Sequence, residues 1–480
     1  MRELNCAHVV QDADTPVGGP HVVRIDGDRI AAVEAAKGGA KRLLAMPALT
    51  NAHDHARTIS TTTFGAGGKP LESWIHFVAL LPAVDAYLSA AVSLSRSALG
   101  GAGVVMVHYT RVQGLTDLPT EAKDVARAAR DVGVRVGFAV ALRNRNQLVY
   151  GAPDSILAAL SPAARDEISR RILRTPMPVA DQMALVDAIA KDTASPTFDV
   201  QYGPQGVQWC SHEMLEAIAN ASKRNGRRIH MHLLETHTQR EWFDANYPDG
   251  VVKFLDGIGF LSPRLTLAHC VWARPDELDL LAARGVTISI NTSSNLGLRS
   301  GVAPLKEMVK RGCRLALGLD GMALDEDDDA LREMRLAHLL HQGVAYNVDV
   351  DRVTLMLMAF RNGRFSIMNK DDGGSITAGA PADLLLLDWD AVDSERLRAD
   401  VDPRDYLFAR TNMRHIHELI VAGRTIVRDG VVTGLDYPAL REELLARLRA
   451  SLAQTPVFAQ ALNELTPLIG KFYRDQTPCC

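Results

Sequence analysis

Histidine and carboxylate side chains follow several short apolar runs of the sequence. His53 and His55 stand two residues apart after the first run, and side chains at positions i and i+2 of a strand point to the same side. His232, His269 and Asp320 stand at the ends of later runs. Imidazole nitrogens and carboxylate oxygens bind Zn²⁺ and similar divalent ions. These residue types predict a metal site if the fold brings the ends of the runs together.

The fifth run holds a second histidine. His230 stands two residues before His232, so its side chain would point the same way. Glu235 follows three residues after His232 and could accept a proton from a bound water, or it could pair with Arg240 and hold a loop. The residues alone leave these alternatives open.

Eight apolar runs separated by amphipathic helical patterns must position these side chains. Such alternation predicts βαβ units and a parallel sheet, and eight units fit a (β/α)8 TIM-like barrel, whose catalytic residues follow the strands. An open doubly wound sheet is the alternative, but no glycine-rich phosphate-binding loop follows the first run. The runs are Leu43–Leu49, Val104–Tyr109, Val134–Val140, Phe198–Tyr202, Arg228–Leu233, Leu265–His269, Thr287–Asn291 and Arg314–Asp320.

Both ends of the chain are rich in predicted strands. His21–Ile25 and Arg29–Val33 flank an Asp-Gly turn, which is a hairpin pattern, and Ala382–Asp388 reads as a buried strand. We predict a small β-sandwich domain from residues 1–45 and 375–440, with the barrel over residues 46–374. Residues 441–480 are predicted to be a C-terminal helical extension, with a helix over Glu442–Leu452 and a polar segment after it.

Composition limits the partners and the compartment. The chain has 53 Lys and Arg against 57 Asp and Glu, so it lacks the basic surplus of a nucleic-acid-binding protein. It contains no apolar run long enough to span a membrane and no apolar core of a secretory signal at its N-terminus. Its six cysteines are scattered, with an unpaired-looking Cys479-Cys480 at the end. These features predict a cytoplasmic protein with free thiols. A homo-oligomer is expected on general grounds.

Four segments together resemble the amidohydrolase superfamily. The closest likeness is to its mononuclear metal-dependent deaminase and chlorohydrolase branch, which includes guanine, adenosine-type and cytosine deaminases and the triazine hydrolases. The resemblance extends from about residue 20 to 435 and includes a returning strand of the small domain at Gly379–Leu384. The four segments are Pro47–His55, His230–Thr236, Leu267–Cys270 and Gly318–Gly321.

The resemblance implies roles for the clustered residues. His53, His55, His232 and Asp320 would bind one divalent metal ion, Zn²⁺ first and Fe²⁺, Mn²⁺ or Co²⁺ as alternatives. Glu235 would be the proton shuttle. His269, together with Asp320, would orient the attacking water or stabilise the tetrahedral intermediate. Two-metal relatives bridge their ions with a carboxylated lysine after the fourth strand, and Val200–Gly206 contains no lysine.

Four further residues are candidates for binding the substrate. Gln205 stands where relatives have a substrate-contacting histidine, although it could instead cap a helix. Trp74 could form a wall of the pocket or belong to the core, and Arg143 could meet an anionic or carbonyl group or lie on an exposed loop. His108 lies near the end of the second run. The acidic segment Asp325–Asp329 resembles a cation site, but a solvated loop leading to a helix N-cap explains it better.

The resemblance implies a hydrolase that releases ammonia or an amine from a small cyclic nitrogen compound, such as a purine, pterin, pyrimidine or triazine. Some chlorohydrolases of the branch lack the carboxylate at Glu235, so its presence favours a nitrogen leaving group. Hydrolysis of a urea, carbamate, thiocarbamate or halide bond by the same site is the alternative within enzymes. A non-catalytic scaffold on the same fold is the alternative outside them.

Overall fold

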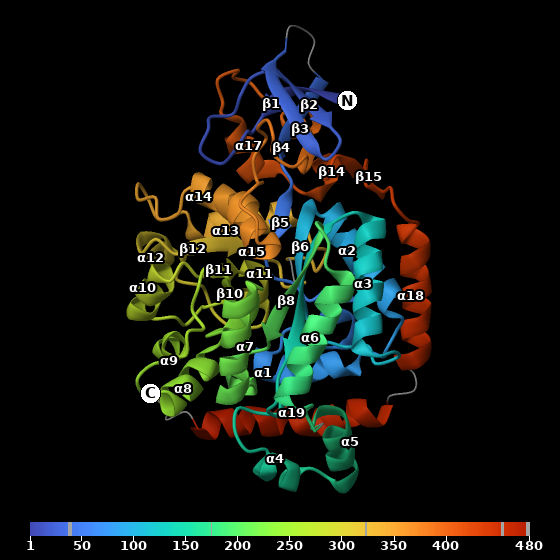
Figure 1. The fold of residues 1–480 in the computed structure, drawn as a ribbon, viewed down its shortest axis with the longest axis vertical. Helices are drawn as coiled ribbons and strands as arrows, with labels where there is room; N and C mark the ends of the chain where they lie inside the picture. Colours follow the sequence, from blue (N-terminus) through green and yellow to red (C-terminus); the bar gives the residue numbers. More distant parts are fainter. Residues whose placement is uncertain (37–40, 174, 322–323, 453–455, 477–480) are drawn as a thin grey trace.

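The computed structural model describes residues 1–36, 41–173, 175–321, 324–452 and 456–476. Within these residues the strands form two eight-stranded sheets, and helices surround one of them (Figure 1). The other sheet lies at one end of the molecule and contains segments from both ends of the chain (Figure 1). The cysteine pair 479–480 lies outside the described residues.

The central sheet is the predicted parallel barrel. Its strands follow the chain in order, each pairing in parallel with the next. The first and last strands approach each other, because the Ala52 N–H donates to the Leu317 carbonyl at 2.8 Å. The strands are β5 (Leu49–Asn51), β6 (Ala102–Tyr109), β7 (Arg135–Leu142), β8 (Phe198–Pro204), β9 (Ile229–Leu233), β10 (Leu265–His269), β11 (Thr287–Ile290) and β12 (Arg314–Leu317).

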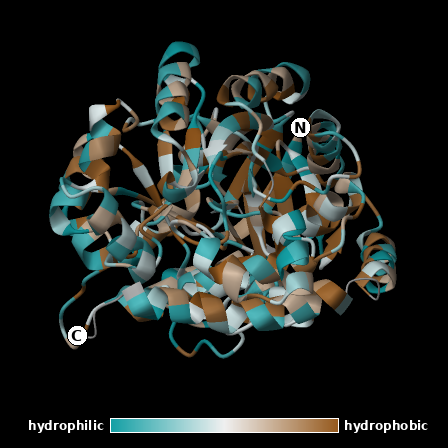
Figure 2. Ribbon diagram, turned by 90° about the horizontal axis from the view of Figure 1, so that it is seen from below, coloured by the Kyte–Doolittle hydropathy of each residue, from teal (hydrophilic) through white to brown (hydrophobic). Residues whose placement is uncertain are grey.

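The strands of the barrel are apolar and nearly all buried, and the helices around them turn polar residues outward (Figure 2). Helix α3 shows why the chain forms a helix between two strands. Asp117 caps its N-terminus, and Gly133, with φ 100°, ends it in the left-handed region. The main helices around the barrel are α2 (Ala86–Leu99), α3 (Leu118–Val132), α6 (Val179–Thr193), α7 (His212–Asn225), α8 (His237–Asn246), α9 (Val251–Gly257), α10 (Pro275–Ala283), α12 (Leu305–Lys310), α13 (Ala330–His341) and α15 (Gly363–Met368).

The second sheet joins the two chain ends. Strand β4 pairs in parallel with β1 on one side and antiparallel with β13 on the other, with Leu386 opposite Ala45. Strands from distant parts of the sequence thus form one hydrogen-bonded sheet, as the sequence predicted. Its strands are β1 (Arg2–Val9), β2 (His21–Asp26), β3 (Arg29–Ala35), β4 (Lys41–Pro47), β13 (Leu384–Asp388), β14 (Ile416–Val421), β15 (Arg424–Arg428) and β16 (Val431–Val432).

The first predicted barrel strand, Leu43–Leu49, is wrong in its bounds. The run is divided between two sheets: Lys41–Pro47 forms β4 of the small sheet, and only Leu49–Asn51 forms barrel strand β5. Ala48 lies between them, and its N–H donates to the carbonyl of Asp383 at 3.0 Å. Both parts are buried, so the apolar pattern does not show where the chain passes from one sheet to the other.

The C-terminal segment differs from the expected polar extension. Helix α18 (Tyr437–Leu452) packs along α2, and a second helix, α19 (Pro456–Gln476), crosses the end of the barrel opposite the small sheet (Figure 1). Phe458, Leu462, Leu465 and Ile469 of α19 are buried. They recur every three or four residues and form one face of the helix. This face packs against α1 (Leu71–Phe77), α4 (Asp154–Ala159) and α5 (Pro162–Ile172).

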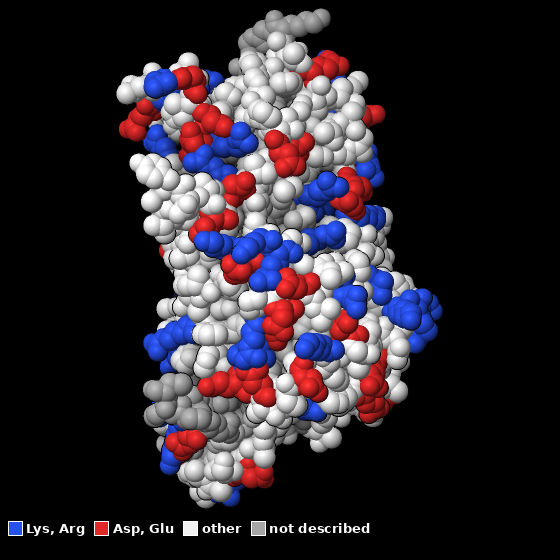
Figure 3. Space-filling model, turned by 90° about the vertical axis from the view of Figure 1, so that its left-hand side faces the viewer, with Lys and Arg blue, Asp and Glu red and all other residues white. Residues whose placement is uncertain are grey.

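The surface carries charges of both signs. On the face seen in Figure 3, Lys and Arg alternate with Asp and Glu over most of the molecule. In the part of the chain that the structure describes, no helix has the length and apolarity needed to cross a membrane.

Candidate metal centre and active site

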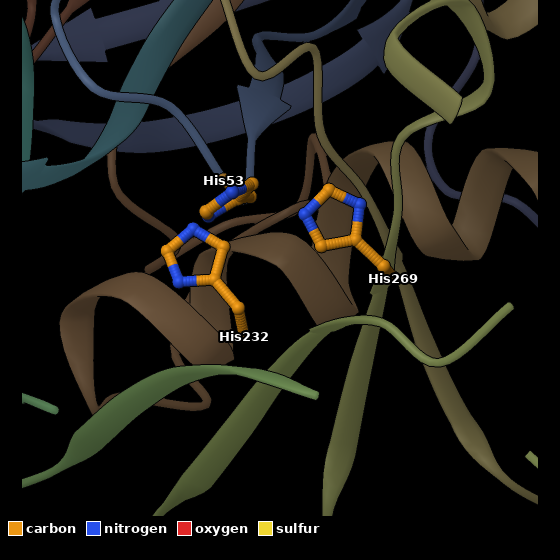
Figure 4. Close-up of side chains that lie close together, drawn as sticks. All are labelled: His53, His232 and His269. Carbon is orange, nitrogen blue, oxygen red and sulfur yellow. The ribbon is translucent and has the colours of Figure 1, made fainter. Parts of the chain in front are cut away.

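Three histidines from three separate strand ends point toward one another (Figure 4). His53 follows β5, His232 lies on β9 and His269 ends β10. One ring nitrogen of each lies within 4.8 Å of the others. His53, His55 and Asp320, which follows β12, form an overlapping group of the same kind. The barrel therefore brings together side chains that are up to 267 residues apart in the sequence, from His53 to Asp320.

The predicted ligand atoms lie around one small space. His55 Nε2 is 3.2 Å from Asp320 Oδ1, and His53 Nε2 is 3.5 Å from the same oxygen. His232 Nε2 lies 3.3 Å from His55 Nε2. Separations of this size are compatible with ligand atoms that share one ion.

Backbone carbonyls determine which nitrogens of two histidines carry the lone pair. His55 Nδ1 lies 2.8 Å from the carbonyl of His108, and His232 Nδ1 lies 2.6 Å from the carbonyl of Gln205. A carbonyl oxygen can only accept, so each Nδ1 carries the proton and each Nε2 presents a lone pair. The Nε2 lone pairs of His55 and His232 therefore face each other beside the carboxylate of Asp320. A cation would stabilise this arrangement, and it fits a divalent ion.

His53 has the same orientation for a different reason. Its Nδ1 lies 2.8 Å from Nε2 of His230. Its Nε2 is buried and has no hydrogen-bond partner among the described residues. His230 thus meets the back of the His53 ring, whereas His232 presents Nε2 to the group of ligand atoms.

Burial keeps the imidazoles in the neutral form that binds metals. It lowers the pKa of His53 well below its ordinary value, and the neighbouring histidines, His232 first, lower it further. The pKa of His232 is lowered in the same way by burial and then by His108 and His55. Neutral imidazoles can donate their lone pairs at neutral pH.

Asp320 remains ionised although it is buried. Burial alone would raise its pKa, but Arg57, followed by His55, holds it well below the usual range. Arg57 Nη2 lies 3.0 Å from Asp320 Oδ1, and the Ser294 hydroxyl donates to Asp320 Oδ2 at 2.6 Å. Our sequence reasoning missed Arg57 and Ser294. The signal for Arg57 was its position only two residues after His55.

Glu235 and His269 form a second pair beside the ligand atoms. His269 Nε2 lies 3.6 Å from Glu235 Oε2, and His269 Nδ1 lies 2.9 Å from Asn295 Oδ1. The amide oxygen of Asn295 accepts a hydrogen bond from Nδ1–H, which leaves the lone pair on Nε2, facing Glu235. Burial raises the pKa of Glu235 well above its ordinary value, and the negative charges of Asp320 and Glu72 raise it further.

Arg240 does not hold Glu235 in place. Its guanidinium donates to Glu277 at 2.8 Å and to Asp244 at 2.6 Å. The carboxyl group of Glu235 instead lies beside His269 and within 3.5 Å of the Ser300 hydroxyl. It is therefore placed among the proposed reacting groups and not in a surface ion pair.

The backbone around the site is strained. Ala56, Leu234, His269, Cys270 and Asp320 have φ between 48° and 76°. This left-handed region is unfavourable for residues other than glycine, asparagine and aspartate. Strain of this kind costs about 1–3 kcal/mol per residue and concentrates at functional sites. It changes the direction of the chain at or just after the ends of four strands, β5, β9, β10 and β12, where the side chains of the site begin.

Two of the four substrate-binding candidates lie next to the proposed metal-binding residues or next to a residue that contacts them. Gln205 is buried, and its side-chain oxygen accepts a hydrogen bond from the Gln147 amide. Its backbone carbonyl orients the ring of His232. Trp74 lies on α1 beneath the guanidinium of Arg57, whose carbon is 4.5 Å from the ring centroid. Both residues therefore line the same region as the metal ligands.

The other two candidates differ in burial, since Arg143 is half-buried and His108 is fully buried. Arg143 lies in the loop after β7, where Gln182 binds its backbone N–H and carbonyl. His108 is fully buried on β6, with Nε2 2.9 Å from the carbonyl of Gly203. Its ring stacks on that of His232 with centroids 4.9 Å apart, so it lies behind the ligands.

The acidic segment Asp325–Asp329 is used in local hydrogen bonds and ion pairs. Asp329 caps the N-terminus of α13, as expected. Asp325 and Asp327 pair with Arg332, and Asp328 pairs with Arg96. Glu326 accepts hydrogen bonds from the backbone of residue 61. The segment is more buried than a solvated loop, since Asp328 and Asp329 are each 1% exposed.

Comparisons with known proteins agree with this geometry. A 5'-deoxyadenosine deaminase from Methanothermobacter thermautotrophicus is 28% identical over 402 residues, which are 83% of this chain and 85% of the relative. The corresponding enzyme from Methanosarcina barkeri is 31% identical over 243 residues, and here the chain spans about half of the relative, 55% of its length.

Two solved structures share the fold. An adenosine deaminase from Xanthomonas campestris with bound zinc has a TM-score of 0.75 at 20% identity, covering 93% of this chain and 98% of its own. A mutant atrazine chlorohydrolase from Arthrobacter aurescens, complexed with zinc and atraton, has a TM-score of 0.78 at 21% identity, covering 93% and 100%. The Amidohydrolase family matches residues 44–426. The chain therefore belongs to the amidohydrolase family, as the sequence predicted.

Proposed function

We propose that this protein is a metal-dependent aminohydrolase that releases ammonia from the adenine ring of a nucleoside related to 5'-deoxyadenosine. The observation that carries the proposal is the convergence of His53, His55 and His232 on the Asp320 carboxylate, with Glu235 beside them. The names of the relatives from M. thermautotrophicus and M. barkeri support the nucleoside.

The four converging residues would hold one divalent ion, most readily Zn²⁺, since three imidazoles and a carboxylate suit it. Bound there, the ion would act as a Lewis acid that lowers the pKa of a bound water to about 7. In the fourth strand and the loop after it, Phe198–Gly206, there is no lysine that could bridge a second ion. One ion per chain is therefore the stoichiometry we propose.

The protein's own side chains would handle the protons. Glu235 Oε2 would accept a proton from the attacking water and return it to the departing nitrogen, a role worth about 10²–10⁴ in rate. His269, held by Asn295, would accept a hydrogen bond at Nε2 from the new hydroxyl group. Arg57 would keep Asp320 ionised through the cycle, because its guanidinium contacts Oδ1 directly.

Burial of the site would exclude bulk water from this chemistry. His53, His269 and Asp320 are each at most 3% exposed. In such surroundings the charges that develop during attack interact more strongly with fixed groups than they would in water. Gln205, Trp74, Arg143 and His108 remain our candidates for binding the substrate or shaping its pocket.

The test is a substrate panel with purified, zinc-supplemented protein. Ammonia release would be measured with 5'-deoxyadenosine, adenosine, guanine, cytosine, a pterin and an aminotriazine, and metal content by elemental analysis. We expect one equivalent of metal and release from adenine nucleosides. Ammonia from another ring only would change the substrate, and chloride or amine release without ammonia would favour the other hydrolytic reactions. Full turnover in protein freed of metal would overturn the proposal.

A further inference from the structure

The C-terminal helix α19 belongs to a cap over the catalytic end of the barrel. Figure 1 shows it crossing this end with α1, α4 and α5 around it. These segments share a hydrophobic cluster of their own, which includes Trp74, Leu148, Ile168 and Leu465 and no residue of strands β5 to β12. The cap is therefore a separately packed layer above the side chains of the proposed active site.

A polar contact links α19 to the interior of this cap. The N–H of Tyr150 donates to the hydroxyl oxygen of Tyr473, on α19, at 3.0 Å. The two rings lie 5.4 Å apart between centroids. Tyr150 is 6% exposed, so its hydroxyl group depends on protein partners.

The hydroxyl of Tyr150 is part of a directional chain that ends at Glu235. The N–H of Glu235 can only donate, and it does so to Gln239 Oε1 at 2.8 Å. This orients the amide, so Gln239 Nε2 donates to the Tyr150 hydroxyl oxygen at 3.4 Å. The Tyr150 proton is then directed to Glu72 Oε1, also at 3.4 Å.

Thr236 closes the chain into a ring. Its hydroxyl donates to the same oxygen of Glu72 at 2.5 Å and accepts from the N–H of Gln239 at 3.1 Å. Each hydrogen bond of the ring therefore has a defined donor and acceptor. The directions follow from the backbone N–H groups of Glu235 and Gln239, which can only donate. Buried networks of this kind are rigid when complete, and they are costly when one member is missing.

We propose that Tyr150, held by Tyr473 of α19, is a positioning residue for Glu235. Its hydroxyl orients Gln239, which fixes the backbone from which the proton-transferring carboxyl extends. This inference rests on the proposed function for its effect on turnover, but the link between Tyr150 and the Glu235 backbone does not depend on it.

The test compares Tyr150→Phe and Tyr473→Phe with two matched controls. Tyr150→Phe keeps the packed ring but leaves Gln239 Nε2 without its acceptor. Tyr87→Phe is the control for the substitution, because Tyr87 donates to Asp131 at 2.9 Å away from the ring. Glu464→Gln is the control for the helix, because Glu464 of α19 accepts from Ser161 of the cap at 3.1 Å and has no contact with the ring.

Two readouts separate positioning from stability. Hydrogen exchange of peptides spanning Ile229–Asn246 reports protection of the Glu235 amide, and steady-state kinetics reports kcat and KM. We expect Tyr150→Phe to accelerate exchange at Glu235 and to lower kcat by about ten-fold, the effect of losing one buried hydrogen bond. KM, metal content and the controls should stay near native values. Tyr473→Phe should give the same pattern with a smaller effect.

Unchanged exchange at Glu235 in folded Tyr150→Phe protein would overturn the inference. So would a loss of kcat that Tyr87→Phe or Glu464→Gln reproduces, since this would reflect general destabilisation. If native protein releases no ammonia from any substrate, the proposed function fails, and the exchange measurement still decides whether Tyr150 fixes Glu235.

Discussion

His53 Nδ1 lies 2.8 Å from His230 Nε2, so the two imidazoles contact each other behind the ligand atoms. The contact gives the two histidines of β9 different surroundings. His230 supports the ring of a proposed ligand, and His232 directs its Nε2 toward His55 and Asp320. Such support orients a ligand and raises its basicity.

The first prediction follows from that contact. His232→Ala should lose the metal, whereas His230→Ala should retain one equivalent with affinity reduced by about 10–100-fold, as for other residues that support a ligand. Competition with a zinc chelator measures both. His230→Gln, which can still hydrogen-bond His53, should recover part of the affinity. Loss of metal in His230→Ala with retention in His232→Ala would reverse our assignment.

The substitution Glu235→Gln should separate the chemical step from metal binding. Glutamine keeps the size of the side chain but cannot accept the water proton. Turnover should fall by about 10²-fold or more, with metal content unchanged. Glu277→Gln is the matched control, because Glu277 is also buried but pairs with Arg240. It should lower the melting temperature and leave turnover close to native. Near-native turnover in Glu235→Gln would remove the proposed proton shuttle.

Glu333 makes stability depend on pH. Burial raises its pKa from an ordinary value of 4.5 to about 7, while Ser293 donates to it at 2.9 Å. Between pH 4.5 and 7 the folded state therefore holds a proton that the unfolded state releases, and stability from this group falls as pH rises. The loss approaches about 3 kcal/mol. Denaturant unfolding at both pH values should show this loss in the native protein and not in Glu333→Gln. Equal pH dependence in both proteins would contradict it.

The small sheet should be required for solubility. A fragment of residues 1–375 lacks β13, whose Leu385 lies opposite Met46 of β4. It would expose the apolar edge of β4, so we expect aggregation on expression. A fragment of residues 1–436 keeps all strands of the sheet and lacks only the terminal helices, and it should remain more soluble. An active, soluble 1–375 fragment would show that the two chain ends do not stabilise each other.

Much of the fold could be predicted from local patterns. Seven apolar runs coincide with barrel strands because buried parallel strands are continuous apolar segments. The prediction for the run Leu43–Leu49 failed for the same reason. Each of the two sheets buries its part of the run, so the apolar pattern continues across the boundary between them. Helix α19 was missed although Phe458, Leu462, Leu465 and Ile469 have helical spacing. Pro467 within the helix and the polar residues around it obscured the pattern.

Short sequence motifs pointed to the proposed ligands but not to the residues that contact them. The ligand types were recognised through short motifs around His53, His232 and Asp320. The contacts of Arg57 with Asp320 and of Gln239 with Glu235 depend on how loops fold over the barrel. Arg57 and Asp320 are 263 residues apart, so no local spacing encodes their contact. Glu235 and Gln239 are only four residues apart, but their contact depends on the turn at Leu234 that precedes α8.

Because β4 of the small sheet runs directly into barrel strand β5, the small sheet and the metal site can each be completed only late in synthesis. Strand β4 and the histidines just after β5 leave the ribosome early, whereas β13, which pairs with β4, emerges hundreds of residues later. At roughly 5–20 residues per second this interval is on the order of tens of seconds. During this interval the edge of β4 that later pairs with β13 is apolar and unpaired in the nascent chain. Asp320, a proposed metal ligand, also emerges late. We expect the metal to be loaded only after translation is nearly complete, with chaperones protecting the open edge until then.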